Sequence, residues 1–288
     1  IADIIDDQVF VVNTETELVT WRWDAQSDYP LAGGGPYPDD WTHLNDVELL
    51  EDGRLMISLR NQDQVVFLDR ETGLLENWTL GSEDDHEVLH EQHNPDYIPA
   101  ERGGPAVLVA DSENGRIVEY QREGEDWRRT WEWRDRRLQW PRDADRLPNG
   151  NTLIADTHGK RVLEVAPNGR VVWSVAVSHP YDVERIGTGG ESALSESARR
   201  LGLESRTDAA TGEGDGNEPL AIVADVLTAP LPSRWVNAAI YVAPVWMGRP
   251  QFFAAGLGLL AVLAWIGLEL SWRLEDGGFG IQWPVYRK

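Results

Sequence analysis

The chain has 288 residues, of which 41% are hydrophobic, so it can bury a sizeable core as one large domain or two small ones. Its 49 acidic and 26 basic residues give a net charge of -23, which excludes a general nucleic-acid binder that relies on neutralising phosphates. Cysteine is absent, so disulfides and thiolate metal ligands are excluded as well.

The basic residues are almost all arginines, because only Lys160 and Lys288 are lysines. A strongly acidic, lysine-poor surface stays soluble in concentrated salt, since the salt screens its self-repulsion. We therefore expect a halophilic source. The first residue is Ile1 rather than methionine, and we expect the chain to begin inside a longer protein.

Residues 1–186 repeat a pattern of short strands. The segment HLNDVELLEDGRLMISLRNQDQVVFLDRETG from His43 aligns with WPRDADRLPNGNTLIADTHGKRVLEVAPNG from Trp140, and a further copy begins at His93. Apolar, β-branched runs alternate with turn sequences such as EDG and PNG, which is typical of about four strands per copy. Repeats of roughly 40 to 50 residues favour β-propeller blades over a solenoid, whose repeats are usually shorter.

The opening of the chain matches only the second half of a repeat, since Ile1-Ala2-Asp3 aligns with Ile154-Ala155-Asp156. The sequence therefore predicts an all-β fold, a β-propeller that is N-terminally incomplete in this chain. A C-terminal transmembrane helix is expected to follow it, as the next segment indicates.

The pattern changes after residue 186. Residues 187–234 are rich in glycine, serine and acidic residues, which predicts a linker or irregular excursion. Residues 235–250 predict an interfacial segment and residues 251–272 a transmembrane helix, because about twenty apolar residues span roughly 30 Å. A buried core helix is the alternative for the second stretch. The short tail, residues 273–288, carries basic residues and favours a cell-membrane protein with its propeller on the extracellular side.

One repeat position carries a histidine in three blades and a tryptophan in the fourth. These residues, each three places before an aspartate, are His43, His93, Trp140 and His179. Equivalent positions near the inner strands of a propeller face its central channel, so the side chains can converge at one mouth. Two alternatives remain: the histidines brace turns by bonding the aspartates, or they bind zinc or copper. We predict neither a metal nor a cofactor.

The sequences around these histidines resemble those of the arylsulfotransferase family of β-propeller enzymes. DWTHLND, SLRNQ and EQHNPD are similar to the family's W-x-H-x-N, S-x-R and Q-H-x signatures, and the resemblance covers residues 40–186. It implies transfer of a sulfuryl group from a small aryl sulfate to a phenol through a histidine in the channel. The alternative is a catalytically silent propeller that binds a ligand or a protein at the membrane.

The resemblance also implies roles for single residues. His179 is the candidate nucleophile and His93 the candidate acid and base, while His43, the third histidine of the site, would help bind the sulfuryl oxygens. The candidates for binding the substrate's sulfuryl oxygens are Arg116, Asn45 and Arg60. Imidazole can act as nucleophile, acid or base near neutral pH, and arginine presents a fixed fork of donors to an oxyanion.

Three other histidines and one arginine-rich run have simpler explanations. His158 falls in a turn between strands, where we expect it to be exposed to solvent. His86 and His90 lie in a polar loop, with a second metal site as the alternative. Residues 128–146 mix arginines with acidic residues and predict salt-bridged outer strands rather than an anion-binding track.

Overall fold

The structure is a computed structural model of the whole chain. It describes residues 1–187, 195–207, 233–242, 247 and 249–275. Most of the predicted linker and most of the predicted tail lie outside these residues.

The chain forms two compact units. The first holds Ile1–Asp215 with Ser233–Asn237, and the second holds Gly216–Pro232 with Ala238–Lys288.

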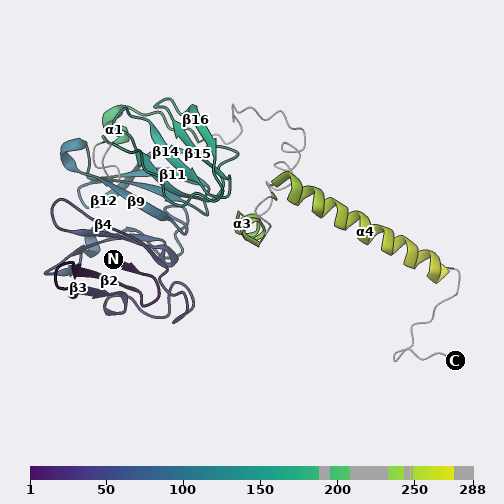
Figure 1. Ribbon diagram of the computed structural model, residues 1–288, viewed down its shortest axis with the longest axis horizontal. Helices are drawn as coiled ribbons and strands as arrows, with labels where there is room; N and C mark the ends of the chain where they lie inside the picture. The colour runs from purple at the N-terminus through teal and green to yellow at the C-terminus, as the bar shows by residue number, and fades with distance from the viewer. Residues whose placement is uncertain (188–194, 208–232, 243–246, 248, 276–288) are drawn as a thin grey trace. The chain divides into compact units, whose positions relative to one another are not determined.

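Four antiparallel sheets make up the first unit, each built from strands that follow one another in the chain (Figure 1). The first sheet contains β1 (Ala2–Asp3), β2 (Gln8–Asn13) and β3 (Leu18–Asp24). The second contains β4 (Leu44–Leu49), β5 (Leu55–Leu59), β6 (Gln64–Asp69), β7 (Gly73–Leu74) and β8 (Leu80–Gly81). The third contains β9 (His93–Ile98), β10 (Ala106–Asp111), β11 (Arg116–Glu123) and β12 (Asp126–Trp133). The fourth contains β13 (Pro141–Arg146), β14 (Thr152–Asp156), β15 (Arg161–Val165) and β16 (Val171–Ala176).

Short 3-10 turns and helices join or follow these strands. The turns are η1 (Ala25–Ser27), η2 (Arg60–Gln62), η3 (Glu76–Trp78) and η4 (Ala100–Arg102). The helices are α1 (Ala198–Leu201), α3 (Ser233–Val242) and α4 (Arg249–Glu275).

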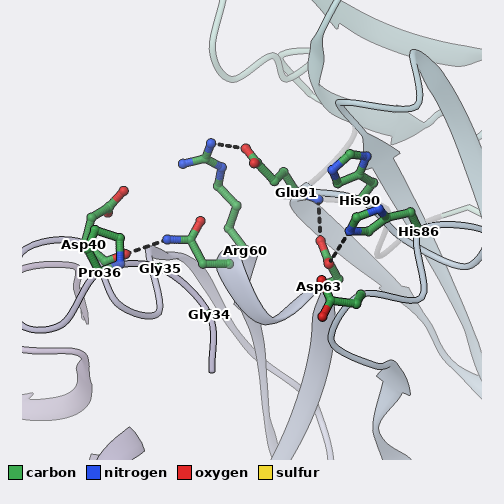
Figure 2. Close-up of a pocket in the computed structure, with 11 residues that line it drawn as sticks. Gly34, Gly35, Pro36, Asp40, Arg60, Asp63, His86, His90 and Glu91 are labelled. Atoms are coloured by element: carbon green, nitrogen blue, oxygen red, sulfur yellow. Dashed lines mark hydrogen bonds and ion pairs between the residues drawn. The ribbon is translucent and has the colours of Figure 1, made fainter. Parts of the chain in front are cut away.

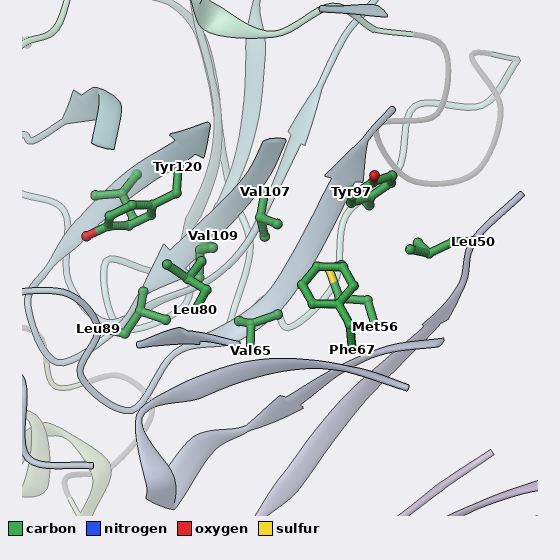
Figure 3. Close-up of a cluster of buried hydrophobic side chains, with 11 residues drawn as sticks. Leu50, Met56, Val65, Phe67, Leu80, Leu89, Tyr97, Val107, Val109 and Tyr120 are labelled. Carbon is green, nitrogen blue, oxygen red and sulfur yellow. The ribbon is translucent and has the colours of Figure 1, made fainter. Parts of the chain in front are cut away.

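The first strand of each sheet lies beside the first strand of the next, in the order β1, β4, β9 and β13. Successive sheets therefore stack as the blades of a propeller, with their leading strands innermost. The predicted all-β propeller fold is confirmed. Apolar residues on facing sheets form the cores between blades, and Phe67 and Met56 of the second sheet pack with Val107 and Tyr97 of the third (Figure 3).

Central strands are covered on both faces, β10 by neighbouring sheets, and β14 by the third sheet on one face and by a cluster with Val183 on the other, which explains their continuous apolar sequences. Every residue of β10 is buried, as is every residue of β14. Truncating a fully buried side chain of these cores, such as Phe67, is expected to cost about 3–5 kcal/mol of stability.

Neighbouring blades are also joined by a repeated hydrogen bond near their inner ends. Ser112 donates its hydroxyl proton to the carbonyl oxygen of Pro141 at 2.7 Å, and Thr157 donates to that of Pro180 at 2.7 Å. Since these bonds tie one blade to the first residues of the next, they fix where the inner residues of each blade lie.

Residues 195–207, inside the segment predicted to be irregular, return to the propeller. Ser197 caps α1, and the carbonyl oxygen of Glu204 accepts the indole N–H of Trp131 at 3.2 Å. Arg206 forms a parallel β-bridge with Trp133, and the carbonyl oxygen of Arg206 accepts the backbone N–H of Arg134 at 2.7 Å. This segment therefore extends the sheet beyond β12.

In the second unit, α4 contains a largely apolar stretch of 19 residues, Ala254–Trp272, with a mean hydropathy of 1.8 and no buried side chain. By length and composition this helix can cross a membrane. It coincides with the predicted span, residues 251–272.

Candidate functional site

In every described blade after the first, a residue with a left-handed backbone conformation precedes the inner strand. His43 (φ 47°) precedes β4, Trp140 (φ 51°) precedes β13, and His179 (φ 52°) takes this place after β16. In the third sheet the corresponding residue is Glu91 (φ 48°), two places before His93. The alignment that put His93 in register with the other two histidines is therefore wrong by two residues.

Strand pairing supports this correction. Asp96 of β9 pairs with Leu108 of β10, as Asp145 of β13 pairs with Leu153 of β14. Asp96 is thus equivalent to Asp145, and the aspartate expected three places after the left-handed residue is replaced by Asn94. His93 instead shares its repeat position with Asn45, Arg142 and Tyr181.

His93 lies at the centre of side chains from several blades and is only 1% exposed. Its Nδ1 is 2.8 Å from the Ser112 hydroxyl oxygen and 3.2 Å from the carbonyl oxygen of Glu91. Because Ser112 donates its proton to Pro141, its oxygen accepts the Nδ1–H of His93. The neutral ring therefore carries its lone pair on Nε2.

Burial lowers the pKa of His93 well below its usual value, and the nearby charges of Arg142, Arg60 and His43 lower it further. His93 is consequently neutral at physiological pH. These three residues come from two other blades, so charges from both neighbouring blades act on His93.

His43 is held by a carboxylate from the loop before it. Its Nδ1 lies 2.5 Å from Asp40 Oδ1. Burial and the charge of Arg60 lower the pKa of His43, while Asp40 opposes them. The Arg60 guanidinium forms an ion pair with Glu91, which joins the second and third blades at this point.

Arg142 is clamped between two aromatic rings. Its Cζ lies 4.2 Å from the ring centroid of Trp140 and 4.5 Å from that of Tyr181. The rings of Trp140 and Tyr181 in turn meet that of His93 edge to face, with centroids 5.7 Å and 6.1 Å away. Arg142 thus brings a fixed cation to His93. Salt-bridged outer strands were predicted for residues 128–146, the run that contains Arg142.

His179 and His158 complete the cluster. Their ring centroids are 6.3 Å apart, and the His158 ring lies 4.4 Å from that of Trp140. His179 is exposed, whereas His158 is only 7% exposed. The expectation of a solvent-exposed His158 is therefore wrong, because its turn points inward. Burial, with the charge of Arg142, lowers the pKa of His158 to about 4.

Arg116 is not brought to this cluster. Its Nε donates to Asp111 at 2.6 Å, and its NH2 group donates to the carbonyl oxygens of Glu87 and Val88 at 2.8 Å and 3.0 Å. Arg161 makes the same bond to Asp156 at 2.7 Å in the next blade. The arginine carried over by resemblance is thus one copy of a structural ion pair that repeats between blades.

Asn45 anchors the inner ends of two blades. Its Nδ2 donates to the carbonyl oxygen of Gln92 at 3.0 Å. This places Asn45 next to the residue that precedes His93.

A pocket of about 380 Å³ opens beside the cluster, and Arg60 lines it (Figure 2). Gly34 forms part of its wall with φ 71°, where a side chain would meet the Gln62 amide at 2.3 Å. This close approach sets the loop from which Asp40 reaches His43. The other residues that line the pocket are Gly35, Pro36, Asn61, Asp63, Asp84, His86, His90 and Glu91.

Two histidines and a buried carboxylate occupy the far side of the pocket (Figure 2). His86 and His90 stack with centroids 3.8 Å apart, and His86 Nε2 lies 3.2 Å from Asp63. Asp63 also accepts the backbone N–H of Glu91 at 2.8 Å, and burial raises its pKa to about 6. Among the residues that the structure describes, no three histidine or acidic side chains are placed to hold a metal ion.

Comparison with known proteins decides the family. The model of the arylsulfotransferase (ASST) family matches residues 3–178. The chain belongs to the arylsulfotransferase family. This match spans all four sheets and ends one residue before His179. No curated protein matches the chain significantly.

Solved structures similar to this arylsulfotransferase family member share little sequence with it. A protein of unknown function from Bacteroides caccae is 16% identical, with a TM-score of 0.45, over 64% of this chain and 59% of that one. The periplasmic gluconolactonase of Pseudomonas aeruginosa is 16% identical, with a TM-score of 0.44, over 65% and 53%. A catalytically inactive virginiamycin B lyase from Staphylococcus aureus is 8% identical, with a TM-score of 0.41, over 61% and 50%. The chain thus spans between half and three fifths of the length of these proteins.

Proposed function

We propose that the protein transfers a sulfuryl group from an aryl sulfate to a phenol, through a histidine in the propeller channel. The observation that supports this most directly is the arrangement around His93, whose ring contacts Trp140 and Tyr181, the two rings that hold Arg142. The charges of His43 and Arg60 act on His93, and His179 lies beside His158. Arg60 and Arg142 supply positive charge for the non-bridging sulfuryl oxygens. No cofactor is needed for this chemistry, and both substrates are small molecules.

His179 is the proposed nucleophile, since it is the accessible histidine of the three. Its imidazole nitrogen attacks sulfur, an N–S bond forms, and the bond from sulfur to the aryl oxygen breaks. The proton that the imidazole ring loses goes to the leaving phenoxide. In the second step the acceptor phenol attacks sulfur, the N–S bond breaks, and the phenol's proton returns to the imidazole.

His93 suits the movement of these protons. Its Nδ1–H is held by Ser112, so the Nε2 lone pair is the group that faces proton transfer. Its lowered pKa keeps this lone pair free in neutral solution. His43, oriented by Asp40, is the proposed second proton carrier, and Asn45 the proposed polar contact beside them. Arg116, bound in its structural ion pair, is left out of the site.

The rival function is a silent propeller that binds a ligand or protein. An assay of the purified protein with 4-nitrophenyl sulfate, with and without phenol, separates the two. The transferase releases nitrophenol at a rate that rises with phenol concentration and forms phenyl sulfate. A rate of nitrophenol release that does not depend on phenol concentration indicates a sulfatase. No release of nitrophenol supports the silent binding module.

We propose further that α4 anchors the protein in the cell membrane, with the propeller on the extracellular side. The apolar stretch Ala254–Trp272 supports the anchor. Substrates would then be met outside the cell, where a small aryl sulfate and a phenol need no transport before reaction.

A further inference from the structure

We propose that Tyr181 is an internal sulfuryl acceptor: in the absence of an external phenol, the enzyme transfers the group to this tyrosine and forms a tyrosine sulfate within its own site. The inference rests on the proposed transferase function. It adds a modification site, and it names a phenol already present in the protein as the acceptor.

Tyr181 lies close to the two histidines that act in the proposed transfer, to His179 in sequence and to His93 in space. It follows His179 by two residues, and its ring meets that of His93 edge to face, with the centroids 6.1 Å apart. Its position in the repeat is that of His93 itself. The phenol of Tyr181 thus lies two residues after the proposed nucleophile and beside the proposed proton carrier.

The backbone around Tyr181 is pinned on both sides. Thr157 donates to the carbonyl oxygen of Pro180 at 2.7 Å, and the N–H of Val183 donates to Asp143 at 2.7 Å. A phenol fixed beside a reactive group behaves as an acceptor at very high effective concentration, so it competes well with water. Tyr181 therefore has the placement that a tethered acceptor needs.

Two arginines that the proposed transfer uses act on Tyr181, together with the carboxylates of Asp46 and Asp182. Arg142 Cζ lies 4.5 Å from its ring centroid, and Arg142 and Arg60 act on its phenol as they act on His93. A sulfuryl group transferred from a histidine to Tyr181 would therefore stay near the same two arginines, Arg142 and Arg60. The ring is also 42% exposed, which leaves a side open to the donor.

The other tyrosines of the propeller differ. The hydroxyl groups of Tyr29, Tyr97 and Tyr120 are hydrogen-bonded to Gln64, Arg54 and the carbonyl oxygen of Val88, respectively. Tyr37 is 46% exposed but packs against Trp41 on a loop, with a ring centroid distance of 5.8 Å. Tyr37 is therefore a matched control, a comparably exposed phenol with no histidine ring contact in the described structure.

The step balances as a simple transfer. The phenol oxygen of Tyr181 attacks sulfur, an O–S bond forms, the N–S bond to histidine breaks, and the phenol's proton returns to the imidazole. Burial raises the pKa of Tyr181 despite the opposing charges of Arg142 and Arg60. Its phenoxide is then a poor leaving group, so the ester persists and leaves an anion against Arg142.

The test uses the full chain as wild type, Tyr181→Phe and Tyr37→Phe. Each is incubated with 4-nitrophenyl sulfate alone, freed of donor, and chased with excess phenol to discharge any histidine-bound group. Cleavage after Arg170 and Arg185 releases peptide 171–185, which is weighed by mass spectrometry. In parallel, the transfer rate to phenol is measured before and after the incubation.

We expect one chase-resistant sulfuryl group on peptide 171–185 of the wild type and of Tyr37→Phe, and none on Tyr181→Phe. The transfer rate of the wild type should fall in proportion to the modified fraction, while the rate of Tyr181→Phe does not change with incubation. Transfer to phenol with an unmodified peptide would overturn this inference alone, as would a chase-resistant group on Tyr181→Phe. An absence of transfer to phenol under every condition would overturn it together with the transferase function.

Discussion

Ser112 determines the tautomer of His93, because its hydroxyl oxygen lies 2.8 Å from Nδ1 while its proton is given to a carbonyl oxygen. The histidine at the centre of the cluster is thus oriented by a serine from its own blade, and the serine by the next blade. Positioning of this kind is what a proton carrier needs to act at a fixed point.

Ser112→Ala should slow sulfuryl transfer about five- to tenfold, since one hydrogen bond that orients His93 contributes roughly 1 kcal/mol. The rate is measured as kcat with 4-nitrophenyl sulfate and phenol. Ser197→Ala is the matched control, because the Ser197 hydroxyl also donates to a carbonyl oxygen, that of Gly103 at 3.0 Å, and Ser197 is not part of the proposed site. Equal losses of kcat in the two variants would mean that Ser112 acts only on stability.

Arg142→Lys should raise the KM for the aryl sulfate about tenfold, because lysine keeps the charge but not the planar group that stacks between Trp140 and Tyr181. Initial rates over a range of donor concentrations measure this. Arg128→Lys, at an exposed ion pair with Asp126, serves as the control. A KM that is unchanged in Arg142→Lys would remove this arginine from the proposed site.

His158 should make the fold sensitive to acid. Folding lowers its pKa from an ordinary value of 6.5 to about 4. Between these two pH values His158 is protonated in the unfolded chain and neutral in the folded chain. The free energy of unfolding therefore drops as the pH falls from 6.5 to about 4, by about 3 kcal/mol from this residue. His158→Asn should lose that part of the drop, as measured by chemical denaturation at several pH values. Identical pH dependence in both proteins would contradict a buried, neutral His158.

The proposed membrane anchor predicts that charged residues placed within α4 prevent its insertion. Arginine in place of Leu260 and Leu263, near the middle of Ala254–Trp272, costs about 2.5–3.5 kcal/mol per residue for insertion. The double variant should move from carbonate-washed membranes to the soluble fraction. Trp272→Arg, at the end of the stretch, should stay with the membranes. Soluble wild-type protein would contradict the anchor.

Much of the fold was predictable because strand chemistry repeats in the sequence. Runs such as VLVAD and TLIAD become β10 and β14. The sequence EDG forms the turn between β4 and β5, and PNG that between β13 and β14. The apolar stretch that predicted a span is α4. The packing of residues 195–207 on β12 was not predictable, because it depends on contacts with Trp131 and Trp133 that are distant in sequence.

The site was predictable only in part, for identifiable reasons. His43, His93 and Arg60 were predicted from their sequence signatures. The repeat position of His93 was misassigned by two residues, because Asn94 replaces the aspartate of the other blades and Asp96 was aligned in its place. Arg142 was missed because neighbouring acidic residues suggested ion pairs. The D-x-x-x-x-R spacing of Asp111 to Arg116 recurs from Asp156 to Arg161, and this repetition could have identified Arg116 as structural.

The most direct test of the account is to find the covalent intermediate. Mixing the protein with 4-nitrophenyl sulfate in the absence of phenol, quenching within the first turnover, and mapping the sulfuryl group by mass spectrometry identifies the residue that carries it. The account predicts the group on His179, with no early labelling and no burst of nitrophenol in His179→Ala. A group found first on His93, or a normal burst in His179→Ala, would contradict it.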